Sequence, residues 1–252
     1  MKQDPKNRYP SVSRISDAQR VRVVKEIFAT VTGKYDFLNH VLSAGQDIHW
    51  RRFAARRMNF EHTFRYLDVA AGTGDLGIAT ALSHPGIHVV GLDFVREMLD
   101  TAQKKIRRRN LSTRIGLLQG DALHLPFPDG GFDAAGIAFG IRNIPDKQSA
   151  FREMLRVVVP GGQVLILEMT FPQHPFIKRL YAPYLTRLLP ALARAFSPNP
   201  DAYRYLADSI LDFPPPPRFA RSMEQAGMVD VRRHPLTLGI THLFVGHKPG
   251  PD

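Results

Sequence analysis

Short apolar runs alternate with amphipathic stretches over most of the chain, beginning near residue 64. Seven of the runs have the length and composition of buried strands: 66–70, 88–93, 115–119, 132–139, 163–168, 229–234 and 242–248. Stretches with helical periodicity lie between them, at 75–83, 95–109, 148–158 and 219–226. Strands that alternate with helices predict a doubly wound, mostly parallel α/β sheet of seven strands.

The connection before the last strand breaks the parallel pattern. Only the segment from Pro235 to Gly239 joins the last two predicted strands. A parallel pair needs a crossover of a dozen or more residues, whereas an antiparallel pair needs only a short turn. We therefore expect the last strand to be antiparallel.

Two further regions are helical in pattern and lie outside this alternation. Residues 17–58 have helical periodicity, with a break expected at Thr32-Gly33. An insertion at 171–217 has a broad apolar face, and Pro183 and Pro190 within it predict broken helices rather than one straight rod. The four prolines at 214–217 predict a stiff connector that is neither helix nor central strand. We expect one domain over 1–252, with a helical N-terminal region at 1–63 and a helical lid at 171–217.

Composition removes several kinds of chemistry. The 252 residues include no cysteine, which excludes disulfides, thiolate nucleophiles and Cys-ligated zinc. The ten histidines form no H-E-x-x-H motif, so we expect no metal site. The N-terminal residues lack the apolar stretch of a secretory signal, and no run has the roughly 18 apolar residues of a spanning helix. These features predict a cytoplasmic protein.

The charge is strongly basic. The net charge is +11, and residues 1–66 carry 13 Lys and Arg against 6 Asp and Glu. Such a balance is typical of proteins that bind a polyanion, either a nucleic acid or an anionic membrane surface. Charge alone does not distinguish the two.

A glycine-rich turn follows the first predicted strand. Gly72, Gly74 and Gly77 fit the G-x-G-x-x-G pattern, and Asp93 lies 21 residues after Gly72, at the end of the second strand. Glycines allow the backbone of a strand-to-helix turn to approach a ligand, and the carboxylate can accept from both ribose hydroxyls. The pattern is found with NAD as well as with other adenosine-containing ligands, so it is weak on its own.

Three features favour S-adenosylmethionine over NAD. Asp68 precedes the glycines, where its carboxylate can face the positive end of an amino-acid-bearing ligand. Asp121, in the segment Gly120 to Ala122, follows the third strand and can accept from an adenine amino group. The predicted antiparallel last strand fits the sheet of class I methyltransferases, a Rossmann-like fold, and not the NAD-binding sheet.

Several narrower motifs resemble those of the ubiquinone/menaquinone biosynthesis C-methyltransferases (the UbiE/MenG family). They are Tyr35-Asp36-Phe37-Leu38-Asn39 with Trp50, Asp121-Ala122 with Leu125-Pro126-Phe127, Phe139-Gly140-Ile141-Arg142-Asn143, and Tyr203-Arg204-Tyr205-Leu206. The resemblance covers roughly residues 21–248. It implies an enzyme that uses S-adenosylmethionine to methylate a ring carbon of a prenylated quinol, converting demethylmenaquinol to menaquinol. A ubiquinone precursor remains open as a second substrate.

The resemblance and the glycine turn together give a set of cofactor residues. These are Asp68, Gly72, Thr73, Gly74, Asp93, Asp121, Ala122 and Ala138. Ala138 stands where a Ser helps line the cofactor pocket in many members of the family, so this chain lacks one hydroxyl there.

Three residues are candidates for the chemistry, which needs a phenolate beside the reacting ring carbon. Arg142 and Asn143 follow the fourth strand, where ligands collect in open α/β sheets. Arg142 can hold the phenolate and Asn143 can donate to the second ring oxygen. Alternatively, Arg142 pairs with a carboxylate such as Asp146. Tyr35 is expected to contact either the cofactor or the quinol, or else to pack in the core.

Other interpretations remain at this stage. A nucleic-acid methyltransferase would be expected to carry an Asn/Asp-Pro-Pro-Tyr/Phe motif after the fourth strand, where residues 139–143 stand instead. An NAD-dependent oxidoreductase and a non-enzymatic scaffold are further alternatives. We expect contact with an anionic membrane through the basic, acid-free stretch 171–196 rather than with nucleic acid. Whether the chain forms a homodimer is left open.

Overall fold

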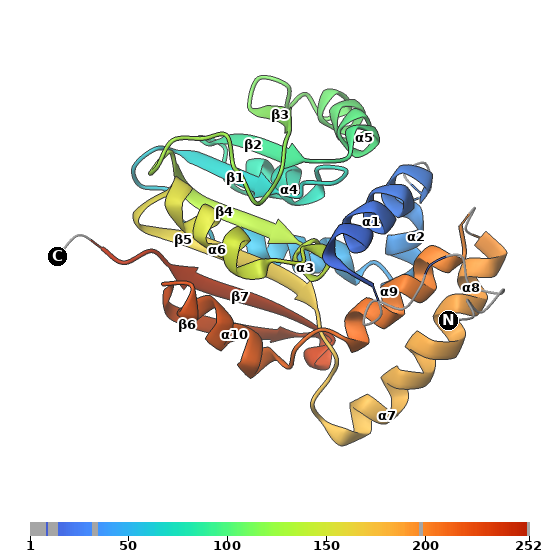
Figure 1. Ribbon diagram of the computed structural model, residues 1–252. Coiled ribbons are helices and arrows are strands. Elements are labelled where there is room, and N and C mark those ends of the chain that lie inside the picture. Colours follow the sequence, from blue (N-terminus) through green and yellow to red (C-terminus); the bar gives the residue numbers. More distant parts are fainter. Residues whose placement is uncertain (1–8, 10–14, 32–34, 197–198, 251–252) are drawn as a thin grey trace.

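A central sheet with helices on both faces dominates the structure, a computed structural model that describes residues 9, 15–31, 35–196 and 199–250. The side chains at positions 31, 35, 37, 38, 195 and 196 lie outside that description. A further group of helices gathers beyond the ends of the strands (Figure 1).

The sheet has seven strands in the order β3-β2-β1-β4-β5-β7-β6. The strands are β1 Arg65–Val69, β2 His88–Asp93, β3 Ile115–Gln119, β4 Phe132–Ala138, β5 Val158–Met169, β6 Val229–Leu236 and β7 Thr241–His247. The first five strands pair in parallel. β7 is antiparallel to both β5 and β6. The predicted fold class, including the antiparallel last strand, is confirmed.

The apolar runs explain which strands lie in the middle. In β4, six of the seven residues are buried, because helices cover both faces of this strand. β3 lies at the sheet edge, and its pattern is mostly exposed. The carboxyl ends of β1, β2 and β4 point to the same edge of the sheet, where a ligand site is expected in this architecture.

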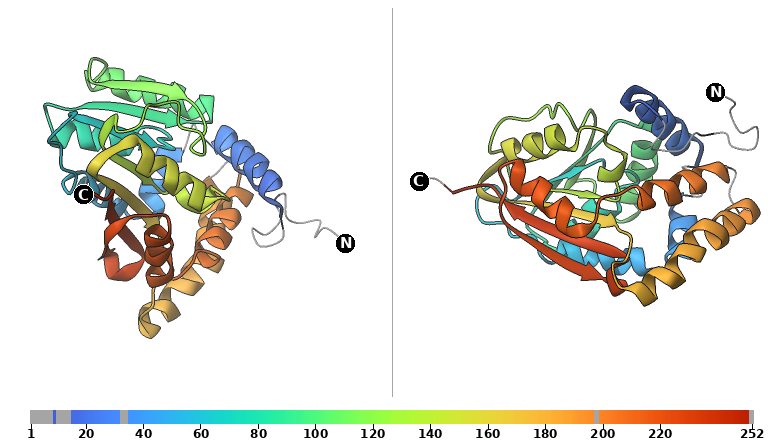
Figure 2. Two further views of the ribbon diagram at one scale, coloured as in Figure 1. Left: turned by 60° about the vertical axis from the view of Figure 1, so that its left-hand side comes forward. Right: turned by 60° about the horizontal axis from the view of Figure 1, so that its bottom comes forward.

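The helices divide into three groups. They are α1 Asp17–Val31, α2 Tyr35–Leu42, α3 Gln46–Ala55, α4 Asp75–Ser83, α5 Arg96–Arg108, α6 Lys147–Val157, α7 Pro175–Pro183, α8 Leu189–Phe196, α9 Asp201–Leu211 and α10 Pro216–Gln225. α6 and α10 cover one face of the sheet, and α3, α4 and α5 cover the other (Figure 2). Each face has its own apolar core, centred on residues such as Phe151 and Phe219 on one side and Tyr66 and Ile106 on the other.

The third group forms a helical cap over the carboxyl ends of the parallel strands (Figure 1). α1, α7, α8 and α9 share a separate apolar core that includes Ile27, Leu185, Leu189 and Ile210. The N-terminal region and the 171–217 insertion, far apart in sequence, therefore meet in one layer. Within the described residues, no helix is both long and apolar enough to cross a membrane.

Two sequence expectations need adjustment, and a third is not tested by the structure. The expectation that the four prolines exclude a helix is wrong, because α10 begins at Pro216. Proline is tolerated in the first helical turn, where the missing N–H has no helical partner anyway. β5 begins before its glycine turn, since Val158 already pairs with Phe132. The break expected at Thr32-Gly33 falls outside the described residues.

The insertion is helical from Pro175 to Phe196, and Pro183 and Pro190 are accommodated within it rather than breaking the chain into loops. A π-helical turn, Tyr184–Leu188, separates α7 from α8. Pro183 ends α7, and Pro190 lies in the first turn of α8. Because proline cannot donate a helical hydrogen bond, the wider turn accommodates the missing bonds while the axis continues.

Candidate active site

A cavity of about 230 Å³ opens at the carboxyl ends of β1, β2 and β4. Its lining includes seven of the eight residues predicted to bind a cofactor: Asp68, Gly72, Thr73, Asp93, Asp121, Ala122 and Ala138. α1 contributes Val21, Val24 and Phe28 to the wall of this cavity. We call this the cofactor cavity.

Glycines shape the turn that forms its floor. Gly72 has φ of 55°, a left-handed conformation, and a Cβ at this position would project into space with no atom within 4 Å. That space belongs to the cofactor cavity, so a side chain there would occupy ligand volume. Gly74 has φ of 81° and packs against α5, where a Cβ would lie 3.2 Å from Ala102 Cβ. Gly74 therefore shapes the turn without lining the cavity.

Asp93 fixes this turn to the end of β2. Its Oδ2 accepts from the N–H of Gly72 at 2.8 Å, and its Oδ1 accepts from the N–H of Val95 at 2.8 Å. Burial raises the pKa of Asp93, and the backbone donors offset this only in part. Each carboxylate oxygen has a second lone pair. Asp93 can therefore hold the loop and still accept from ribose hydroxyls.

Asp68 is almost completely buried beneath the same turn, with 1% of its surface exposed. Its Oδ2 accepts from the N–H of Gly77 at 2.8 Å. Burial raises the pKa of Asp68 to about 7, although Gly77 and the Arg51 charge act in the opposite direction. A carboxyl group in this state gains from a cationic ligand beside it, because such a ligand stabilises the charged form.

Asp121 lies at the opposite, open rim of the cavity. Its Oδ1 accepts from the N–H of Leu123 at 2.9 Å, and the side chain is 61% exposed. Ala122 follows it in the lining, and Ala138 lines the cavity from the last position of β4.

A second cavity, of about 280 Å³, lies between the sheet edge and the helical cap. Most of its lining is apolar, and α9 and α3 contribute the largest shares, with further residues from α1, α2, α7 and α8. Four residues line both cavities: Phe28, Arg51, Phe139 and Asn143. A ligand in the first cavity can therefore reach a ligand in the second at the place where these four side chains meet. We call the second space the substrate cavity.

Arg142 and Asn143 lie at this meeting place, in the short 3₁₀ helix Ile141–Asn143 (η3) after β4. Arg142 is buried, and its Nη1 donates to Glu168 Oε1 at 2.5 Å and to Phe139 O at 2.7 Å. The alternative pairing with Asp146 is wrong, since Asp146 instead caps α6 by accepting from the N–H of Ser149. Arg142 lines only the substrate cavity, whereas Asn143 lines both.

Phe139 directs the chain into this position. It has φ of 59°, a left-handed conformation that is costly for a bulky residue. Its ring lies 6.0 Å from that of Trp50, and the Arg51 guanidinium lies 5.1 Å from its centroid. The strained turn thus places an aromatic side chain between the cavities, against two residues of α3.

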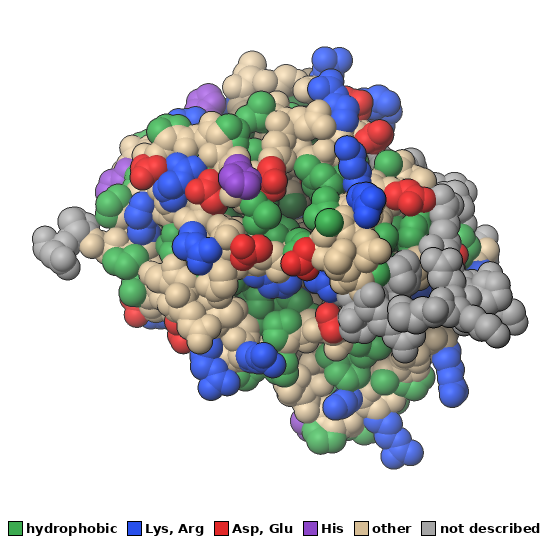
Figure 3. All heavy atoms as spheres, viewed as in Figure 1, with side chains coloured by type: hydrophobic (Ala, Val, Ile, Leu, Met, Phe, Trp, Pro, Cys, Tyr) green, Lys and Arg blue, Asp and Glu red, His purple; other side chains and the backbone are tan. Residues whose placement is uncertain are grey.

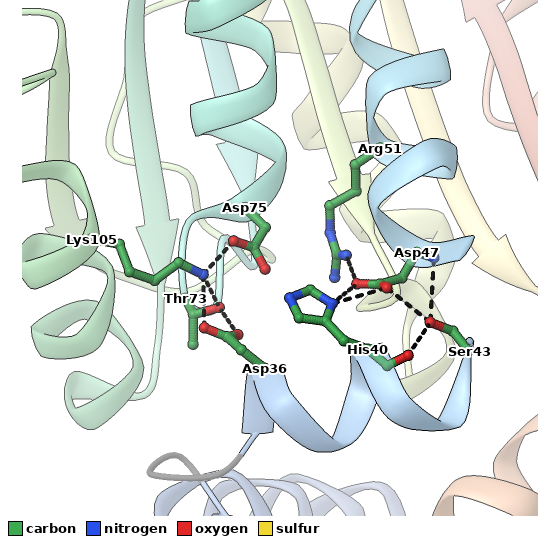
Figure 4. Close-up of polar contacts among 8 residues, drawn as sticks. All are labelled: Asp36, His40, Ser43, Asp47, Arg51, Thr73, Asp75 and Lys105. Atoms are coloured by element: carbon green, nitrogen blue, oxygen red, sulfur yellow. Dashed lines mark hydrogen bonds and ion pairs between the residues drawn. The ribbon is translucent and has the colours of Figure 1, made fainter. Parts of the chain in front are cut away.

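Arg51 is a site residue that the sequence interpretation missed. Its Nη1 donates to Asp47 Oδ2 at 2.5 Å, and Asp47 also accepts from His40 Nδ1 at 2.8 Å and from Ser43 Oγ at 2.8 Å (Figure 4). Burial alone would raise the pKa of Asp47. The Arg51 charge and the other two hydrogen bonds outweigh that effect, so the pKa lies below its ordinary value. The sequence did contain a signal that could have identified this pair, because Asp47 and Arg51 are four residues apart in a predicted helix.

Lys105 connects the N-terminal helices to the glycine turn. Its Nζ donates to Asp36 Oδ2 at 2.8 Å, to Thr73 Oγ1 at 3.2 Å and to Asp75 (Figure 4). Thr73 Oγ1 in turn donates to Asp36 Oδ1 at 2.6 Å. Asp36 therefore links α2 to α5 rather than capping its own helix. Tyr35 begins α2 beside Asp36, but its side chain lies outside the described residues.

No group of three His, Asp or Glu side chains that could hold a metal occurs in the described part of the chain. His242 is buried in β7, where its Nδ1 lies 2.8 Å from Thr170 Oγ1. Burial, assisted by Arg233, lowers its pKa to about 4. It lies outside the lining of both cavities.

Comparison of the sequence with known families gives one match over nearly the whole chain. Residues 14–248 match the model of the ubiE/COQ5 methyltransferase family. A ubiquinone/menaquinone biosynthesis C-methyltransferase from Geotalea daltonii is 39% identical over 89% of this chain and 96% of its own length. The demethylmenaquinone methyltransferase of Deinococcus radiodurans is 42% identical over 90% of this chain and 93% of its own.

Solved structures are similar at the level of the fold. A putative S-adenosylmethionine-dependent methyltransferase from Methanococcus maripaludis has a TM-score of 0.63 at 20% identity, covering 88% of this chain and 93% of its own. Phosphoethanolamine N-methyltransferase 2 of Haemonchus contortus, in complex with S-adenosylhomocysteine, has a TM-score of 0.56 at 17% identity. The match covers 76% of this chain and 50% of the other.

Proposed function

The chain belongs to the ubiE/COQ5 methyltransferase family, and we propose that it methylates a ring carbon of a prenylated quinol, with demethylmenaquinol as substrate. It is an S-adenosylmethionine-dependent methyltransferase. A prenylated ubiquinone precursor is the second candidate, because relatives bear both names.

One observation carries the proposal. A cavity with a glycine turn and several carboxylates in its lining opens into a more apolar cavity, and four residues line both. Such an arrangement suits a charged methyl donor in the cofactor cavity and an apolar aromatic acceptor in the substrate cavity. Both helical regions contribute to these walls, which supports our proposal that they belong to a single domain with the sheet.

The cofactor cavity fits S-adenosylmethionine by the chemistry of its side chains. We assign Asp93 to the ribose hydroxyls, Asp121 to the adenine amino group and Asp68 to the cationic amino-acid end. Gly72 and Thr73 supply the backbone of the turn, and Gly74 keeps that turn close to α5. When bound, S-adenosylmethionine supplies a methyl group activated by a positively charged sulfur.

In the substrate cavity, the chain's task is to favour a phenolate next to the reacting carbon and to exclude water. Arg142 provides a permanent positive charge in a buried site, where electrostatic stabilisation is stronger than in water. Asn143 lines both cavities, so we place its carboxamide beside the point of transfer. Phe139 and Trp50 present aromatic surface that aligns the ring. Tyr35, the first residue of α2, remains a proposed contact of the cofactor or the quinol.

We further propose that the enzyme works at the cytoplasmic surface of an anionic membrane, where a prenylated substrate is found. The outer side of the helical cap combines exposed Phe176, Leu180 and Leu188 with Lys178, Arg179, Arg187 and Arg194. Residues 171–196 contain no Asp or Glu. Basic and apolar side chains lie together over α7, in the lower part of Figure 3. Such a surface can insert apolar groups while its cations meet lipid phosphates.

Methyl transfer measured on two acceptors side by side tests the proposed function. Labelled S-adenosylmethionine is given with reduced demethylmenaquinol in one reaction and with a reduced ubiquinone precursor in the other. We expect label in the demethylmenaquinol product. Transfer to neither acceptor, from folded protein that binds S-adenosylhomocysteine, would overturn the assignment.

A further inference from the structure

Four buried polar atoms on the wall of the substrate cavity have no hydrogen-bond partner among the described residues. They are Arg142 Nε, Asn143 Oδ1, Tyr181 Oη and Tyr205 Oη. Buried polar atoms are nearly always satisfied in folded proteins, because leaving one unpaired costs free energy. A cluster of such atoms on one otherwise apolar cavity therefore indicates a ligand that brings complementary oxygens.

The two tyrosines come from different helices of the cap. Tyr181 lies on α7 and is 7% exposed, while Tyr205 lies on α9 and is 6% exposed. Burial raises the pKa of both hydroxyls, so both remain protonated donors at neutral pH. Both tyrosines line the same cavity as Arg142.

Tyr184 provides an internal comparison. It also lines the substrate cavity and stacks on Tyr181, with ring centroids 5.7 Å apart. Its hydroxyl, however, already donates to the carbonyl oxygen of Leu42 at 2.5 Å. Of these two stacked tyrosines, Tyr184 therefore has its hydroxyl bonded to the backbone, whereas the hydroxyl of Tyr181 is available to a ligand.

The positions of the four atoms suggest that they bind two different ring oxygens of the substrate. Asn143 lies where the cavities meet and Arg142 precedes it in η3, so we assign both to the hydroxyl beside the reacting carbon, rather than Asn143 to the second ring oxygen as expected from the sequence. Asn143 Oδ1 can accept from that hydroxyl, and Arg142 Nε can donate to its oxygen. The tyrosines belong to the cap, on elements that do not line the cofactor cavity. They suit the oxygen on the far side of the ring.

We propose that Tyr181 and Tyr205 hydrogen-bond this far ring oxygen, so that the enzyme selects aromatic rings with two oxygens over phenols with one. The inference rests on the proposed function and makes it more specific. One tyrosine donates to the ring oxygen, while the other can accept from the ring hydroxyl. A phenol without that oxygen would leave both hydroxyls buried and unpaired, which is the stronger source of discrimination.

The test pairs single-atom changes in the enzyme with a single-atom change in the substrate. Tyr181→Phe and Tyr205→Phe are compared with the control Tyr184→Phe. Each enzyme is assayed anaerobically with a prenylated 1,4-naphthalenediol and with the matching naphthol that keeps only the hydroxyl beside the reacting carbon. Comparing the ratio of kcat/KM between enzymes cancels the different intrinsic reactivity of the two rings.

We expect Tyr181→Phe and Tyr205→Phe each to lower kcat/KM roughly 10-fold for the diol and less than about 2-fold for the naphthol. Tyr184→Phe should change both substrates by the same factor, because its hydroxyl bonds the backbone. Equal effects on both substrates in the Tyr181 and Tyr205 variants, whether equal losses or no loss, would overturn the inference. No methylation of either ring by the wild type would instead overturn the proposed function. Binding of S-adenosylhomocysteine and thermal unfolding verify that each variant is folded.

Discussion

Arg142 Nη1 donates to Glu168 Oε1 across 2.5 Å, joining the loop after β4 to the end of β5 beside the substrate cavity. Glu168 is fully buried and also accepts from the N–H groups of Arg142 and Met169. The carboxylate therefore fixes one side of the guanidinium, while Nε is left without a partner among the described residues. This geometry holds a positive charge in place before substrate arrives, which is the condition for electrostatic catalysis.

Arg142→Lys tests whether this geometry matters in addition to the charge. Lysine keeps the charge but lacks the planar group that can bond Glu168 and the substrate together. We expect kcat to fall about 100-fold, with the Kd of S-adenosylhomocysteine unchanged because Arg142 does not line the cofactor cavity. Steady-state kinetics and calorimetry measure the two quantities.

Arg156→Lys is the matched control for that variant. Arg156 makes a comparable set of bonds, to Glu153 and Asp129, but lies outside both cavities. Its substitution should lower the unfolding temperature and leave kcat as it was. An Arg142→Lys enzyme with normal kcat would remove the catalytic role assigned to this residue.

Asp68 predicts a pH dependence of cofactor binding. Its pKa of about 7 means that below this pH the free protein holds a proton there. Because the cationic end of the ligand favours the carboxylate, binding at lower pH must displace that proton. Affinity should therefore rise with pH up to about 7, by at most roughly 10-fold per unit. Calorimetry of S-adenosylhomocysteine binding across about pH 5.5 to 7 measures this slope.

Asp68→Asn should bind more weakly and lose that slope. Asp121→Asn is the comparison, since this carboxylate lies at the open rim of the same cavity and is mostly exposed. It should weaken binding while the slope persists. A wild-type affinity that does not vary over this range would contradict the role given to Asp68.

Lys105 predicts a coupling between α2 and the cofactor. Lys105→Met leaves the carboxylates of Asp36 and Asp75 without their shared cation, so α2 should move away from the glycine turn. We expect the Kd of S-adenosylhomocysteine to increase roughly 10-fold. Lys104→Met, an exposed neighbour on the same helix, removes an equal charge and should have no effect. Identical affinities in the two variants would refute the coupling.

The basic face of the helical cap predicts membrane binding. Replacing Arg187 and Arg194 with Glu should reduce co-sedimentation with anionic liposomes, by more than about 10-fold if each charge contributes about 1 kcal/mol. Arg232→Glu with Arg233→Glu changes the net charge equally on exposed positions of β6 and should retain binding. Equal losses in both pairs would mean that net charge alone, and not this face, attracts the protein to lipid.

Much of the fold follows from local pattern. The limits of β2 and β3 were predicted to the residue, because an apolar run bounded by turn residues has few alternatives. The proline run before Phe219 was interpreted too simply, since proline opposes a helix interior but suits its first turn. The glycine turn and Asp93 were also visible, because their spacing reflects a single local structure.

The substrate cavity could not be predicted in the same way. Tyr181 and Arg51 lie 130 positions apart in the sequence and meet only because the cap folds over the sheet edge. Periodicity places Tyr181 on an apolar face but does not say whether its hydroxyl finds a partner there. The pairing of Arg142 with Glu168 rather than with nearby Asp146 is also a tertiary effect, produced by the adjacency of β4 and β5.

The position of the transferred methyl group tests the central claim most directly. The enzyme is incubated with S-adenosylmethionine labelled with ¹³C in its methyl group and with reduced demethylmenaquinol, and the product is analysed by NMR. The account predicts a labelled methyl group on the ring carbon next to the prenyl chain. A label on a ring oxygen, or an unlabelled quinol recovered from protein that binds S-adenosylhomocysteine, would contradict it.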